Sequence, residues 1–208
     1  MKGNHVIDTR AELGGRLAKA QQLFAADMVG NTMTVRHQDG HYRHLQFARP
    51  GTHYWYEITS WPGALALRGD MGDYLFARQE DMFDVFRRAG DQRVDPVYWA
   101  GMTVGGRDSV KVFAEEHVQG LIADAVREGA GVPGLTEAVK EFFAPDSGTD
   151  LTTEAGARSA LSAFEHDGFT FDGSDEWDFL EYDFAFLWSC HALAAGIQLY
   201  DEAALTAA

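Results

Sequence analysis

The sequence contains a single cysteine, Cys190, which excludes a disulfide within the chain. No charged N-terminal stretch precedes an apolar segment, so we expect no secretory signal. The most apolar run, residues 184–200, is interrupted by three polar residues. It is also shorter than the roughly 20 apolar residues that a membrane span requires. These absences predict a protein of a reducing, cytoplasmic compartment that contacts no membrane.

Basic residues are scarce in the second half of the chain. Residues 1–104 carry 12 acidic and 12 basic side chains, whereas residues 105–208 carry 20 and 5. Within residues 146–184 there are 11 acids and one base, Arg158. A field of one sign repels nucleic acids and anionic membranes and attracts basic protein surfaces or cations. The charge thus predicts a basic protein surface as partner, with no direct binding to nucleic acid, and identifies no reaction.

The composition is otherwise that of a folded protein. Of the 208 residues 46% are hydrophobic and 12% aromatic, enough for a sizeable core despite the charge. We expect one α+β domain over residues 1–208, with a β-rich part at 30–79 and a helical, acidic part at 80–208. We find no internal repeat.

The sequence of the β-rich part, residues 30–79, predicts an antiparallel meander. Short runs rich in aromatic and β-branched residues alternate with glycine-containing turns, and connections this short permit only antiparallel neighbours. Asp39-Gly40 is read as a two-residue turn, which would place His44 beside Val35 and Arg43 opposite Arg36. The five predicted strands are residues 32–37, 41–48, 54–61, 64–68 and 74–78.

Helical periodicity dominates the remainder of the chain. An N-terminal helix is expected from a capping box formed by Thr9 and Glu12, and a later one from Ser109 as its N-cap. A short strand at 169–171 is expected to add to the sheet. The predicted helices are residues 10–26, 82–90, 109–128, 135–143, 153–166 and 184–201.

Several motifs occur along the chain: HYRHL at 41–45, WPGAL at 61–65, GDMG at 69–72, YxFxR at 74–78, DMFxxF at 81–86, and Trp188 with GIQ at 196–198 and YD at 200–201. By these motifs the chain resembles a family of uncharacterised bacteriophage and prophage proteins. Ala64 and Ala195 depart from that pattern, where larger residues are usual. The resemblance implies an accessory gene product that acts on host machinery, replication or defence, and it carries over no catalytic residue.

The acidic segment 172–183 is the first candidate site, because carboxylates alternate there with aromatic side chains. Three interpretations stay open: a solvated face, an imitation of the DNA phosphate line that occupies a basic groove, and a divalent-cation loop at 172–176. The binding residues predicted for this segment are Asp172, Asp175, Glu176, Trp177, Asp178 and Glu181.

A second candidate is the 69–73 turn, whose glycines would let a ligand approach two carboxylates. With the arginines and aromatic residues of the sheet, it would form a small-ligand or metal-dependent enzyme site. The alternatives are an ordinary turn and arginine–carboxylate pairs that orient helices on the sheet. This second site would comprise Asp70, Asp73, Arg78, His44 and His53.

No spacing of histidines or acids matches a known metal site, so we predict no metal, no cofactor and no catalytic residue. The leading hypothesis is a non-enzymatic, acidic accessory protein in the host cytoplasm. It would bind a basic surface of a host protein, such as a nucleic-acid-handling or defence component. Homo-oligomerisation is left open.

Overall fold

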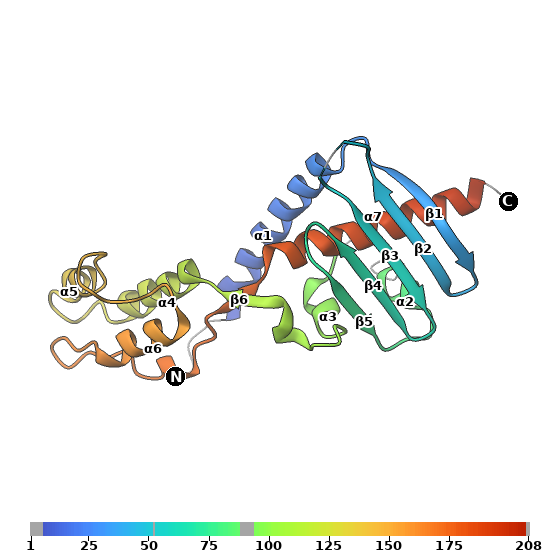
Figure 1. The fold of residues 1–208 in the computed structure, drawn as a ribbon. Helices are drawn as coiled ribbons and strands as arrows, with labels where there is room; N and C mark the ends of the chain where they lie inside the picture. The colour runs from blue at the N-terminus through green and yellow to red at the C-terminus, as the bar shows by residue number, and fades with distance from the viewer. Residues whose placement is uncertain (1–5, 52, 88–93, 207–208) are drawn as a thin grey trace. The chain divides into compact units, whose positions relative to one another are not determined.

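The computed structural model describes residues 6–51, 53–87 and 94–206 (Figure 1). Whereas the sequence was read as one domain, its contacts separate into two compact units. Unit 1 comprises Met1–Val110 and Tyr182–Ala208, and unit 2 comprises Lys111–Glu181. The predicted α+β class is confirmed, with an N-terminal helix, a five-stranded antiparallel sheet and a mainly helical second half.

Unit 1 contains the predicted meander. The strands are hydrogen-bonded in the order in which they occur in the chain, and every neighbouring pair is antiparallel. Apolar and polar side chains alternate along the strands, because successive residues point to opposite faces of a sheet. The strands are β1 (Thr32–Asp39), β2 (Tyr42–Ala48), β3 (Tyr56–Trp61), β4 (Ala64–Gly69) and β5 (Tyr74–Ala77).

The first hairpin turns one residue later than predicted. Asp39 pairs with Tyr42, so the two loop residues are Gly40 and His41. Gly40 has a φ of 57°, which suits a turn that needs positive φ only at its first central residue. A bulge between Val35 and His37 absorbs the change of register. As a result His44 lies opposite His37, and the predicted pairing of Arg36 with Arg43 is wrong.

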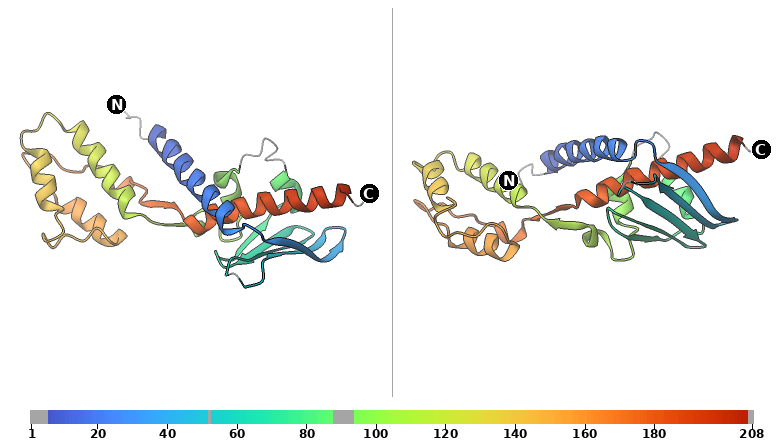
Figure 2. Two further views of the ribbon diagram at one scale, coloured as in Figure 1. Left: turned by 90° about the horizontal axis from the view of Figure 1, so that it is seen from above. Right: turned by 45° about the horizontal axis from the view of Figure 1, so that its top comes forward.

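One face of the sheet is covered by α7 (Phe184–Thr206), the most apolar helix. In Figure 1 the helix runs behind the strands, and Figure 2 shows it with α1 on the same side of the sheet. Gly196 allows the close approach, because a Cβ there would lie 2.8 Å from Ile58 Cδ1 and 2.9 Å from Phe47 Cζ. The helix therefore packs against the aromatic and aliphatic side chains of β2 and β3.

Three further helices of unit 1 surround this layer. Helix α1 (Val6–Asp27) packs along α7 and begins before Thr9, which is therefore not its N-cap. Helix α2 (Met82–Arg87) was predicted, whereas the short α3 (Pro96–Ala100) was not. Asp95 caps α3 by accepting a hydrogen bond from the Tyr98 amide.

The predicted helix at 109–128 is divided in the structure. A 3₁₀ turn, η1 (Arg107–Val110), is followed by β6 (Lys111–Phe113), and α4 (Glu115–Glu128) begins only afterwards. Strand β6 pairs with β7 (Leu180–Tyr182) in a two-stranded sheet that the sequence analysis missed. The predicted strand at 169–171 is absent from the described residues, where Phe169 forms only an isolated bridge with His166.

Unit 2 is built from short helices around a core rich in phenylalanine. Its further elements are α5 (Leu135–Phe142), α6 (Glu154–Ala163) and η2 (Ser174–Glu176). Thr153 caps α6 by accepting a hydrogen bond from the Gly156 amide. Phe164 contacts the rings of Phe142 and Phe171 at centroid distances of 5.3 and 5.2 Å. Such aromatic contacts let a unit of 71 residues bury a core of its own.

None of the described helices combines the length and the apolarity that crossing a membrane demands.

Candidate functional site

The negative charge of the protein is concentrated in unit 2. The 71 residues of this unit carry 16 acidic and 4 basic side chains, a net charge of −12, out of −15 for the whole chain. Unit 1 has the same number of acids, 16, but 13 bases, for a net charge of −3. The charge asymmetry of the sequence thus coincides with a structural unit more closely than with the two halves of the chain.

Three of the four bases of unit 2 are paired with acids of the same unit. Lys111 Nζ lies 2.7 Å from Asp178 Oδ2, and Arg127 lies 2.7 Å from Asp124 on the same helix. The third base, Arg158, lies 2.8 Å from Glu154. These pairs leave most of the acidic side chains of unit 2 to face solvent.

Arg158 also fixes the course of the acidic segment. Its guanidinium donates hydrogen bonds to the carbonyl oxygens of Asp175, at 3.2 Å, and Trp177, at 3.4 Å. The same group lies 4.4 Å from the centre of the Phe179 ring, a cation–π distance. A single base thus ties α6 to the connection that contains η2.

Two aromatic residues of this segment, Trp177 and Phe179, pack into the core of unit 2. Phe179 is 1% exposed, and Trp177 packs 6.1 Å from Phe171, between ring centroids. Asp172, Asp175 and Glu176 are exposed. From Trp177 to Phe179 the alternation read from the sequence is therefore one between core and solvent, because successive side chains of an extended segment point in opposite directions, whereas Asp175 and Glu176 are exposed on the 3₁₀ turn η2.

Two other predicted binding residues have partners within unit 2. Partial burial opposes the ionisation of Asp178, but hydrogen bonds from Lys111 and from the Leu180 amide outweigh it and lower the pKa of the carboxyl. Glu181 lies 3.7 Å from His117 Nδ1. The exposed carboxylates of Asp172, Asp175 and Glu176 therefore form the outward-facing part of the candidate site.

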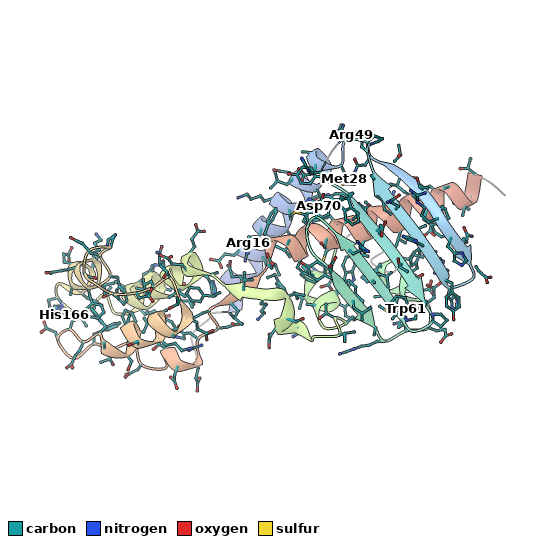
Figure 3. All side chains as sticks on the ribbon, in the orientation of Figure 1. Arg16, Met28, Arg49, Trp61, Asp70 and His166 are labelled. Atoms are coloured by element: carbon teal, nitrogen blue, oxygen red, sulfur yellow. The ribbon has the colours of Figure 1, made fainter. Side chains whose placement is uncertain are left out.

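The residues of the second candidate site are distributed over the sheet. Asp70 and Asp73 lie in the β4–β5 turn, whereas Arg78 follows the opposite end of β5. Asp70 Oδ2 accepts a hydrogen bond from the Trp55 amide, at 3.2 Å, so this carboxylate fixes the turn. His53 is exposed in the β2–β3 connection. Figure 3 shows Asp70 at one end of the sheet and Trp61 at the other.

His44, the remaining residue of that set, belongs to a polar network on the uncovered face of the sheet. Its Nε2 lies 3.5 Å from Glu57 Oε2, and Glu57 also accepts a hydrogen bond from Gln46. Arg36 donates to Gln46, and Arg68 Nε lies 3.8 Å from Glu57. The sequence analysis did not single out Glu57. Its position opposite Gln46 and Arg68 could be derived only from the strand register.

Arg43 points to the covered face and forms a buried ion pair. Its two terminal nitrogens donate to the two Asp81 oxygens at 2.8 and 2.9 Å, and the guanidinium lies over Phe83. Burial disfavours the charged carboxylate, but the hydrogen bonds from Arg43 and the Phe83 amide outweigh it and lower the pKa of Asp81. Arg87 similarly binds Asp201 of α7 at 2.7 Å. The Arg43–Asp81 pair links the sheet to the start of α2, which is the structural alternative considered for the arginines of the sheet, and the Arg87–Asp201 pair links α2 to α7.

Comparison of the chain with protein-family models, curated proteins and solved structures found no significant match. The functional argument is therefore based on the geometry and the charges described above.

Proposed function

We propose that this protein is an acidic accessory protein of the bacteriophage or prophage type that binds a basic surface of a host protein through unit 2. One observation carries the proposal: a compact unit of 71 residues holds 12 of the 15 net negative charges. Proteins that handle nucleic acids present basic grooves, and a rigid acidic body would compete for such a groove. A component of host replication or defence is the partner class that fits this chemistry.

The outward-facing acids of the η2 connection are the proposed contact. Asp172, Asp175 and Glu176 are exposed, and Arg158 binds the backbone carbonyls of Asp175 and Trp177. A preordered surface loses less conformational entropy on binding than a flexible acidic tail would. Charge complementarity would chiefly raise the association rate.

A ligand site at the 69–73 turn is the weaker proposal. Asp70 is engaged by the Trp55 amide, and Arg78 follows the far end of β5. Neither observation favours a shared pocket for these residues.

Capture of partners from host lysate tests the proposal. The wild type is compared with the triple variant D172N/D175N/E176Q, and with the matched control E137Q/E141Q/D146N, which removes the same charge from exposed positions on and after α5. We expect a partner at low salt, weaker retention at high salt, and a loss that is larger for the η2 variant. No partner at low salt, or retention that is independent of salt, would contradict the proposal.

A further inference from the structure

Among the described residues of unit 1, no helix covers one of the two faces of the sheet. Helix α7 packs against the opposite face, and in Figure 1 this open face is turned toward the viewer. The open face consists of the alternate residues that point away from α7. They are Thr32, Thr34, Arg36, His37, Asp39, Tyr42, His44, Gln46, Ala48, Glu57, Thr59, Trp61, Ala64, Ala66, Arg68, Leu75 and Ala77, with the bulge in β1 placing both Arg36 and His37 on this face.

Half of the open face is apolar. Tyr42, Trp61 and Leu75 are 54, 37 and 38% exposed. Between Trp61 and Leu75 lie the small side chains of Ala64 and Ala66, because Trp61 pairs with Ala64 and Ala66 with Leu75. A solvated sheet face usually carries polar side chains, so an apolar patch with exposed tryptophan and tyrosine indicates a contact surface.

The other half of the open face contains charges of both signs. Arg36 and Arg68 lie on either side of Glu57, and Asp39 lies at the edge on β1. In an interface with twofold symmetry, the same patch meets itself and must therefore supply partners for its own charges. A patch with two arginines and two carboxylates meets this requirement. A nucleic acid, by contrast, would need an excess of cations.

The size of the face is also compatible with self-association. Five strands spaced about 4.8 Å apart, with roughly six residues each at about 3.3 Å, give a face of roughly 500 Å². Two copies packed face to face would remove about 1,000 Å², the lower end for a specific interface. From these three observations we infer that the open face of unit 1 is the docking surface for a second copy of this chain. The two sheets pack face to face in the homodimer.

Sedimentation velocity over a concentration series tests this inference on the full-length chain. We expect a monomer–dimer equilibrium for the wild type. Leu75→Arg places a charge in the apolar half and should weaken self-association by at least about tenfold, because an unpaired charge is costly to bury. Ala66→Glu is a second variant of the same patch with the same expected effect.

Val97→Arg is the matched control, because Val97 is 41% exposed on α3, which packs against α7 on the other side of the sheet. It should dimerise like the wild type, and a thermal melt of each variant verifies that it is folded. A wild type that stays monomeric at its highest soluble concentration would overturn the inference. So would a dimer that survives both open-face substitutions in folded protein. A monomeric wild type whose open-face variants lose a host partner would assign the face to that partner instead.

Discussion

Units 1 and 2 contain equal numbers of acidic side chains and use them differently. In unit 1 several acids have arginine partners inside the fold: Asp81 binds Arg43, and Asp201 binds Arg87. In unit 2 the bases are few, and the surplus acids face solvent. Acidic side chains therefore stabilise the fold of unit 1 through ion pairs, whereas in unit 2 they give the surface its negative potential. The number of arginines and lysines nearby decides which role an acidic side chain has.

The buried pair of unit 1 should give the largest effect. Arg43→Ala removes the bidentate partner of Asp81, which keeps only the Phe83 amide and Arg87 at 3.9 Å, and we expect a loss of about 3–5 kcal/mol in the free energy of unfolding. Urea denaturation measures it. The control Arg36→Ala, on the open face, should cost less than about 1 kcal/mol. Equal losses for the two variants would mean that the Arg43–Asp81 pair contributes no more to the free energy of unfolding than an exposed arginine does.

Two glycine-to-alanine substitutions, one in each unit, should have opposite effects on stability. Gly196→Ala forces a methyl group against Ile58 and Phe47 in unit 1, at a cost of about 1–3 kcal/mol. Gly120 lies in α4 of unit 2 with open space around it, so Gly120→Ala should stabilise that helix by up to about 1 kcal/mol. Thermal melts of both variants provide the comparison, and destabilisation by both would contradict the open space around Gly120.

Acidification should destabilise unit 1 by protonating Asp81. Its pKa in the folded state is lowered, so the pair stabilises the fold above the ordinary aspartate pKa of about 4. The stabilisation is lost as the pH falls through the lowered pKa. Asp81→Asn should lower stability at neutral pH and flatten its dependence on acid, measured as urea midpoints between neutral and strongly acidic pH. Glu80→Gln, whose side chain is 77% exposed, is the control and should keep the wild-type profile.

The pair between Lys111 and Asp178 in unit 2 should give the smallest effect. The Asp178 side chain is 59% exposed, so solvent screens the interaction. We expect Lys111→Met to cost at most about 1 kcal/mol in a denaturation experiment. A loss as large as that of Arg43→Ala would show that unit 2 also depends on its ion pairs.

The sequence predicted the meander because each strand alternates apolar and polar residues between glycine turns. It placed the first turn one residue too early, since Asp39-Gly40 and Gly40-His41 are both acceptable and the bulge beside Arg36 decides between them. The division into units was not predicted. Its boundary lies at β6 and β7, and strands of three residues have no periodicity that distinguishes them from a helix start.

The acidic candidate site was predicted in part. Counting charges identified the segment, because acid content depends only on composition. The direction of Trp177 and Phe179 could not be read from alternation, which is the same whether the aromatic residues face a partner or the core. Arg158 was noted only as the lone base of the segment, since its contacts with Asp175 and Trp177 are made to backbone carbonyls.

The pairing of β6 with β7 determines where unit 2 joins unit 1. It brings the first and last residues of unit 2 side by side. The residues of unit 1 that flank them are neighbours as well, since the Asp183 amide donates to the Val110 carbonyl at 2.9 Å. A segment with adjacent ends can be inserted into a host fold, exchanged or deleted with little disturbance of that fold. The adjacent ends of unit 2 therefore give it the geometry of a segment that can be removed or exchanged without breaking the sheet of unit 1.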